Sequence, residues 1–116
     1  MSSINIAQRR SDSVVILDLQ GKINLGAESS QLRQTIRSLV EEGEKKILLN
    51  LAGVSSIDSS GLGELVSGLA TLQRNGGDLR LVNLNERLSE MITLTKLLTV
   101  FDIYDDEAQA VESFGG

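Results

Sequence analysis

The residues best suited to do chemistry in this sequence lie together between positions 55 and 63. This segment reads Ser55-Ser56-Ile57-Asp58-Ser59-Ser60-Gly61-Leu62-Gly63, with four hydroxyl groups, one carboxylate and two glycines. Serine hydroxyls beside a carboxylate are the groups from which proteins build a nucleophilic serine, a phosphate acceptor or a helix N-cap. The choice among the three depends on which other reactive residues the chain supplies.

The sequence lacks the groups that would make a serine catalytic. It has no histidine and no cysteine, which excludes a Ser-His-Asp triad, thiol chemistry, disulfides and thiolate-bound zinc, and leaves oxygen-ligated Mg²⁺ or Ca²⁺ open. No lysine lies between Lys46 and Lys96, so Ser59 has no neighbouring histidine or lysine in the sequence to activate it, and the segment is not a phosphate-binding P-loop. We therefore expect no catalytic residue, no metal and no cofactor, and a protein that is not an enzyme.

Length and composition predict one soluble domain. The 116 residues suit a single domain over 1–116, and 41% apolar residues suffice for one core. The net charge of −5 and the lack of a basic cluster argue against binding to nucleic acid or to an anionic membrane. Residues Met1–Asn5 do not resemble a signal peptide, and no apolar run approaches the roughly 20 residues that span a bilayer. We expect a cytoplasmic protein.

Strand and helix patterns alternate along the chain. The expected strands are residues 4–9, 14–19, 47–51, 79–82 and 100–104, with turns at 10–12 and 53–58. The expected helix N-caps are Asn24, Asp58 or Ser59, Asn85 and Asp105. The resulting order, β-β-α-β-α-β-α-β-α, predicts an α/β domain with a mixed, mostly parallel sheet of about five strands surrounded by about four helices.

Three glycines fall near the start of the second expected helix, at Gly61, Gly63 and Gly68. Each costs a helix about 1 kcal/mol relative to alanine, so we interpret them as a sign that something approaches the backbone closely. If the approaching group is a partner protein, replacing Gly61 by a bulky residue would weaken binding while the melting temperature stayed nearly unchanged.

Four segments, taken in order, resemble the STAS domain of bacterial anti-sigma factor antagonists. They are Gly21-Lys22-Ile23-Asn24 before the first helix, the Asp58–Gly63 turn, the Gly76-Gly77-Asp78-Leu79 turn and the ending Thr99–Tyr104. The resemblance extends across nearly the whole chain and implies a STAS-type fold. The family often has Asp where this chain has Asn24.

The resemblance implies a phosphorylatable binding switch. In the family, the serine directly after the aspartate is phosphorylated by a partner anti-sigma factor that is itself a GHKL-type serine kinase, and a PP2C-type phosphatase removes the phosphate. By position the acceptor is Ser59, with Ser60 as the second candidate. The unphosphorylated protein would sequester the kinase and would be released on phosphorylation, so controlling sigma-factor-dependent transcription. The implied partner-binding residues are Asn24, Asp58, Ser59, Ser60, Gly61, Leu62 and Gly63.

Two other interpretations share the fold class. A two-component receiver also has an aspartate after its third strand, but it needs an acidic pair near the end of its first strand and a lysine after its last. Here Asp12 and Asp18 are not adjacent, and Tyr104 is followed by Asp105-Asp106. A STAS domain can also be a scaffold module or an accessory subunit of a transport system without phosphorylation, and nothing in the sequence excludes that role.

Overall fold

The computed structural model describes residues 4–23, 27–96 and 100–115, which form five strands and four helices. The strands are β1 (Asn5–Ser11), β2 (Val14–Ile23), β3 (Lys46–Ile57), β4 (Asp78–Val82) and β5 (Ile103–Tyr104). The helices are α1 (Ala27–Glu41), α2 (Ser59–Arg74), α3 (Glu86–Leu94) and α4 (Glu107–Ser113). None of the helices in these ranges is both long and apolar enough to cross a membrane.

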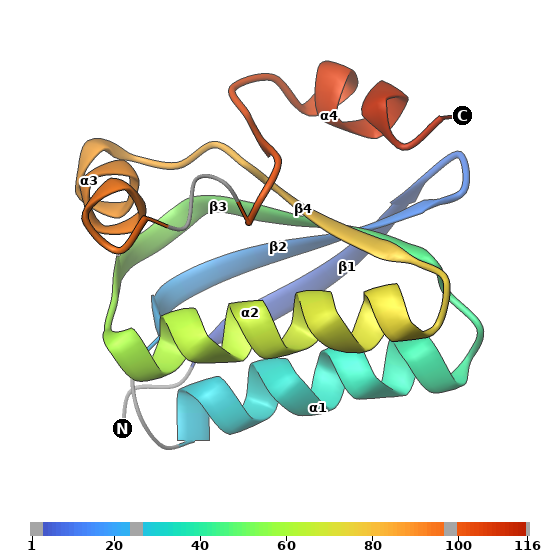
Figure 1. Cartoon of the computed structure of the whole chain (residues 1–116), viewed down its shortest axis with the longest axis horizontal. Coiled ribbons are helices and arrows are strands. Elements are labelled where there is room, and N and C mark those ends of the chain that lie inside the picture. Colours follow the sequence, from blue (N-terminus) through green and yellow to red (C-terminus); the bar gives the residue numbers. More distant parts are fainter. Residues whose placement is uncertain (1–3, 24–26, 97–99, 116) are drawn as a thin grey trace.

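The strands form one sheet in the order β1-β2-β3-β4-β5. β1 pairs antiparallel with β2, and all other neighbours pair parallel. Helices α1 and α2 pack side by side on one face, α4 lies over the other, and α3 lies at the end where β3 and β4 finish (Figure 1). The predicted α/β fold with a mixed, mostly parallel sheet is confirmed.

The central strands are buried on both faces of the sheet. On β2, Val15 and Leu17 belong to the large core cluster under α1 and α2, while Val14 and Ile16 join Leu48 of β3 in a second cluster under α4. Burial on both sides explains why these strands read as unbroken apolar runs instead of alternating with polar residues. β3, the strand that leads into the serine-rich segment, is thus packed on both faces of the sheet.

The third strand is longer than the sequence predicted. β3 continues to Ile57 instead of ending at Leu51, so the expected turn at residues 53–58 is wrong. Gly53 is a strand residue, and a Cβ there would lie 2.8 Å from the carbonyl oxygen of Leu19. The pairing of β2 with β3 also shifts register nearby. The glycine therefore marks a close approach of two strands, which a sequence pattern does not separate from a turn.

Other differences concern the ends of elements. The hairpin turn falls at residues 12–13, not 10–12, with Asp12 in the left-handed region (φ 54°). The last strand is only Ile103–Tyr104, and Asp106 instead of Asp105 caps α4. Adjacent residues often have similar preferences for turn and cap positions, and the packing of the whole chain decides which of them ends the element.

Arg9 of β1 ties α4 to the sheet. Its guanidinium donates to Asp18 of β2 (Nε–Oδ2 2.5 Å, Nη2–Oδ1 2.8 Å) and to Glu107 of α4 (Nη2–Oε1 2.7 Å). Asn50 of β3 donates to the same Asp18 carboxylate at 2.8 Å. The hydrogen bonds from Arg9, helped by the one from Asn50, hold the pKa of Asp18 below its usual value although burial acts in the opposite direction.

Asp18→Asn is expected to lower the free energy of unfolding at neutral pH by about 1–2 kcal/mol, because it removes the ionised partner of Arg9. The folded-state pKa lies below the unfolded value of about 3.9, so this contribution is present at neutral pH and is lost as the pH falls through the folded pKa. Urea unfolding at pH 7 and at about pH 3 measures the effect. The gap between wild type and variant should narrow at the lower pH, and an equal gap at both would contradict the assignment. The control substitution Asp105→Asn, at an exposed residue, should leave the free energy of unfolding unchanged at both pH values.

Candidate functional site

β2 and β3 finish together beside the first turn of α2. Their last residues, Ile23 and Ile57, are paired across the sheet. The N–H of the next residue, Asp58, donates to the Ile23 carbonyl oxygen at 3.2 Å. This is the carboxyl end of parallel strands, where α/β proteins commonly place their functional residues.

Asp58 is the N-cap of α2. Its backbone is extended (φ −96°, ψ 180°), and its Oδ1 accepts a hydrogen bond from the Gly61 N–H at 2.8 Å. The cap satisfies one of the backbone donors that every helix leaves free in its first turn. Of the two predicted caps the structure selects Asp58, and Ser59 becomes the first residue of the helix.

The predicted site residues differ in exposure. Those that solvent reaches are Ser59 and Gly63, which are exposed, and Asp58 and Ser60, which are half-buried. Gly61 and Leu62 are buried, so they position the surface without forming it. Asn24 lies outside the described residues. No group of three or more acidic side chains in the described part of the chain could hold a metal ion.

Gly61 is required by the fold itself. A Cβ at Gly61 would lie 2.1 Å from the Ile23 carbonyl oxygen, a backbone atom of β2. At Gly68 the close group is the side chain of Ile36 of α1, 2.9 Å from the Cβ position. The expectation that a bulky residue at Gly61 would leave the melting temperature unchanged is therefore wrong. Gly63 differs, because nothing lies within 4 Å of a Cβ placed there.

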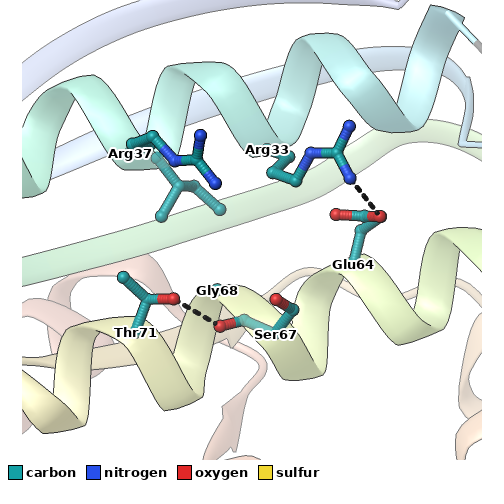
Figure 2. A pocket seen from close by; sticks show the side chains of 7 residues that line it. Arg33, Arg37, Glu64, Ser67, Gly68 and Thr71 are labelled. Atoms are coloured by element: carbon teal, nitrogen blue, oxygen red, sulfur yellow. Dashed lines mark hydrogen bonds and ion pairs between the residues drawn. The ribbon is translucent and has the colours of Figure 1, made fainter.

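An ion pair links α1 to α2 next to this turn. Nη1 of Arg33 lies 3.5 Å from Oε1 of Glu64, and Arg37 lines the same groove one turn along α1 (Figure 2). Ser60 is four residues before Glu64, on the same side of α2 and toward α1, whereas Ser59 is on the open side. The sequence analysis missed Arg33 and Glu64, because a pair between two helices depends on how the helices pack.

A comparison with protein-family models matches residues 5–110 to the STAS domain. The chain is a member of the STAS domain family. The match spans the whole sheet and includes the first turn of α2 with Ser59.

Known proteins that resemble this STAS domain carry a common description. It is 31% identical to the anti-sigma-B factor antagonist of Bacillus subtilis, over 87% of this chain and 91% of the relative. The crystal structure of a Thermotoga maritima protein described as a candidate anti-sigma factor antagonist superposes with a TM-score of 0.87 at 31% identity, covering 94% of this chain and 93% of that one.

A third relative has been solved in two states. The Bacillus protein SpoIIAA, an anti-sigma factor antagonist, matches in its unphosphorylated form with a TM-score of 0.71 at 22% identity, covering 97% of this chain and 99% of SpoIIAA. Its phosphorylated form gives 0.72 at 21% identity, covering 94% and 98%. At this identity the likeness concerns the fold.

Gly61→Ala and Gly63→Ala should change stability in opposite directions. The Gly61 variant must push α2 away from Ile23 and should lose about 1–3 kcal/mol. The Gly63 variant adds a methyl group in open space within a helix and should gain up to about 1 kcal/mol. Thermal melts of both variants against wild type measure this. Two shifts of the same sign would show that the close contact at Ile23 does not constrain α2.

Proposed function

We propose that this STAS domain is an anti-sigma factor antagonist that binds an anti-sigma factor while Ser59 is unmodified and is released when Ser59 is phosphorylated. The observation that carries the proposal is the exposure of Ser59 at the first position of α2, directly after the Asp58 cap. The names of the relatives support it, since the B. subtilis protein and SpoIIAA are called anti-sigma factor antagonists and SpoIIAA is known in a phosphorylated form.

The surface around Ser59 suits a partner that comes close to the backbone. Gly63 lies one turn after Ser59 on the same side of α2 and presents no side chain to solvent. A partner can therefore contact the helix directly there, with the Ser59 hydroxyl and the Asp58 carboxylate at the edge of the contact. The partner in this proposal is an anti-sigma factor that is also a GHKL-type serine kinase, which phosphorylates the residue that it covers.

Phosphorylation would act on the interface and not on the fold. A phosphate adds about −1.5 to −2 charges at neutral pH, next to the Asp58 carboxylate and on a chain whose net charge is already −5. A surface shaped for a neutral hydroxyl would have to desolvate that charge and would be repelled by it. The N–H groups at the start of α2 that Asp58 does not cap would accommodate a phosphate without unfolding the helix.

The rest of the proposed cycle requires two further proteins. A PP2C-type phosphatase restores the Ser59 hydroxyl, and the antagonist then sequesters the anti-sigma factor again, so that the sigma factor is free to direct transcription. The STAS domain is the substrate and the binding partner in this cycle, and the kinase and the phosphatase supply the catalysis. Such a cycle takes place in the cytoplasm.

Ser59 variants test the proposed switch. With the cognate GHKL kinase and ATP, the wild type should gain one phosphate that mass spectrometry maps to Ser59. Ser59→Ala should stay unmodified and still bind the kinase, because the surface remains neutral. Ser59→Asp should bind at least about tenfold more weakly, because it puts a second carboxylate beside Asp58. If the wild type stays unmodified and Ser59→Asp binds normally, the switch is contradicted and the scaffold role remains.

Asp58 variants separate its charge from its role as a cap. Asn caps a helix about as well as Asp, so Asp58→Asn should keep the stability of the protein and lose only the charge. Asp58→Ala removes the cap and should cost about 1 kcal/mol. Phosphorylation rates and urea unfolding of the two variants distinguish the roles. If Asp58→Asn is phosphorylated at the wild-type rate, the Asp58 charge has no part in presenting Ser59 to the kinase.

A further inference from the structure

Two adjacent serines, Ser59 and Ser60, are candidate phosphate acceptors, and the structure gives them different surroundings. Ser59 is exposed on the open side of α2, whereas Ser60 is half-buried and lies toward α1. The Asp58 carboxylate is within two residues of both serines and caps the helix through the Gly61 N–H, so it does not favour Ser59 over Ser60. The side chain that distinguishes them is Glu64, one turn further along α2.

The carboxylate of Glu64 is poorly compensated. Its Oε1 lies 3.5 Å from Nη1 of Arg33, which is long for a hydrogen bond, and its Oε2 is buried without a hydrogen-bond partner among the described residues. Only 20% of the Glu64 side chain is exposed, so water screens its charge weakly. A second anion beside this carboxylate is therefore repelled more strongly than one beside a fully exposed carboxylate.

Ser60 is the serine that this repulsion reaches. It is four residues before Glu64, and residues at this spacing are neighbours on a helix surface, about 5–6 Å apart between Cβ atoms. Ser59 is five residues before Glu64 and therefore lies on a different side of the helix. A phosphate on Ser60 would face the Glu64 carboxylate directly, and a phosphate on Ser59 would not.

Arg33 adds to the effect, because Glu64 engages a cation that would otherwise be available to a phosphate on Ser60. Helices α1 and α2 start at the same end of the molecule and run in the same direction (Figure 1). The Arg33 guanidinium donates from Nη2 to Oγ of Ser30 at 3.4 Å, one turn nearer the start of α1. It thus lies toward the end at which α2 begins, and its partner on α2 is Glu64 (Figure 2).

We propose that Glu64 selects the acceptor: its carboxylate disfavours a phosphate on Ser60, by repulsion and by engaging Arg33, and so confines phosphorylation to Ser59. The inference rests on the proposed function, because it concerns which serine the kinase modifies. In the transfer, a serine Oγ bonds to the γ-phosphorus of ATP, the bond from that phosphorus to the β-phosphate oxygen breaks, and ADP and the hydroxyl proton leave. The new charge lies beside Glu64 only if the acceptor is Ser60.

Phosphorylation in a Ser59→Ala background tests the selection. With the cognate GHKL kinase and ATP, Ser59→Ala should stay unmodified. The double variant Ser59→Ala, Glu64→Gln should gain a phosphate that mass spectrometry maps to Ser60, at a rate at least about fivefold higher than in Ser59→Ala alone. Adding Glu112→Gln in place of Glu64→Gln removes an exposed carboxylate on α4, and this matched control for net charge should leave Ser60 unmodified.

A thiol in place of each serine measures the same charge effect without the kinase. The chain has no cysteine, so Ser60→Cys and Ser59→Cys each give a single thiol. The pH dependence of alkylation by iodoacetamide gives the pKa of that thiol, which a neighbouring negative charge raises because it opposes the thiolate. Adding Glu64→Gln should lower the pKa of the thiol at position 60 by about half a pH unit and leave the pKa at position 59 unchanged.

The outcomes separate the two proposals. A wild type that stays unmodified at Ser59 would overturn the switch, whereas a thiol pKa at position 60 that does not respond to Glu64→Gln would overturn the selection by Glu64. The selection also fails, with the Ser59 switch still standing, if Ser59→Ala is phosphorylated on Ser60 while Glu64 is in place. It fails in the same way if Ser60 stays unmodified in the double variant.

Discussion

The placement of Ser59 depends on one backbone contact, between the carbonyl oxygen of Ile23 and the start of α2. That oxygen accepts the Asp58 N–H and lies where a side chain on Gly61 would have to be. It therefore joins the end of β2, the end of β3 and the first turn of the helix at a single point. With these three elements joined, the Asp58 cap has one geometry, and the residue after it can only emerge at the surface.

This arrangement lets a charge be added at one residue without disturbing the fold. The apolar face of α2, from Leu62 to Leu72, is buried in the main core and does not involve the first residue of the helix. In the proposed switch, a phosphate on Ser59 would therefore change the free energy of docking far more than the free energy of unfolding.

Much of this could be predicted from the sequence because the signals are local. The order of strands and helices follows from the apolar runs and from the caps at Asp58 and Asn85, and the Asp58–Gly63 turn is visible as a motif. The meaning of the glycines could not be predicted in the same way. Gly61 and Gly53 are required by contacts with β2, which is distant from them in the sequence. From the sequence alone, Gly61 therefore resembles part of a partner site, and Gly53 resembles a turn residue.

The exposure of Leu94 at the end of α3 could not be predicted from the sequence for the same reason. Leu94 and Ile92 are alike in type and close in sequence, and only the direction in which α3 packs decides that one is exposed and the other buried. Helical periodicity predicts that a helix has an apolar side, but a single additional leucine at its end carries no signal of its own. Residues at the margin of an apolar side are assigned by tertiary structure.

The helices on the two faces of the sheet differ in how easily they detach from it. α4 has seven residues, too few for a stable isolated helix, and is held by a small apolar cluster, by Arg9, whose side chain is 45% exposed, and by Arg80 of β4, which donates to Ser113. Such a segment separates from a protein at a lower cost than global unfolding, so its amide protons exchange with solvent through partial opening. The amides of β3 and of the buried turns of α2 should exchange only when the main core comes apart. The serine turn is built on these slowly exchanging elements, and its shape therefore persists through the opening events that release α4.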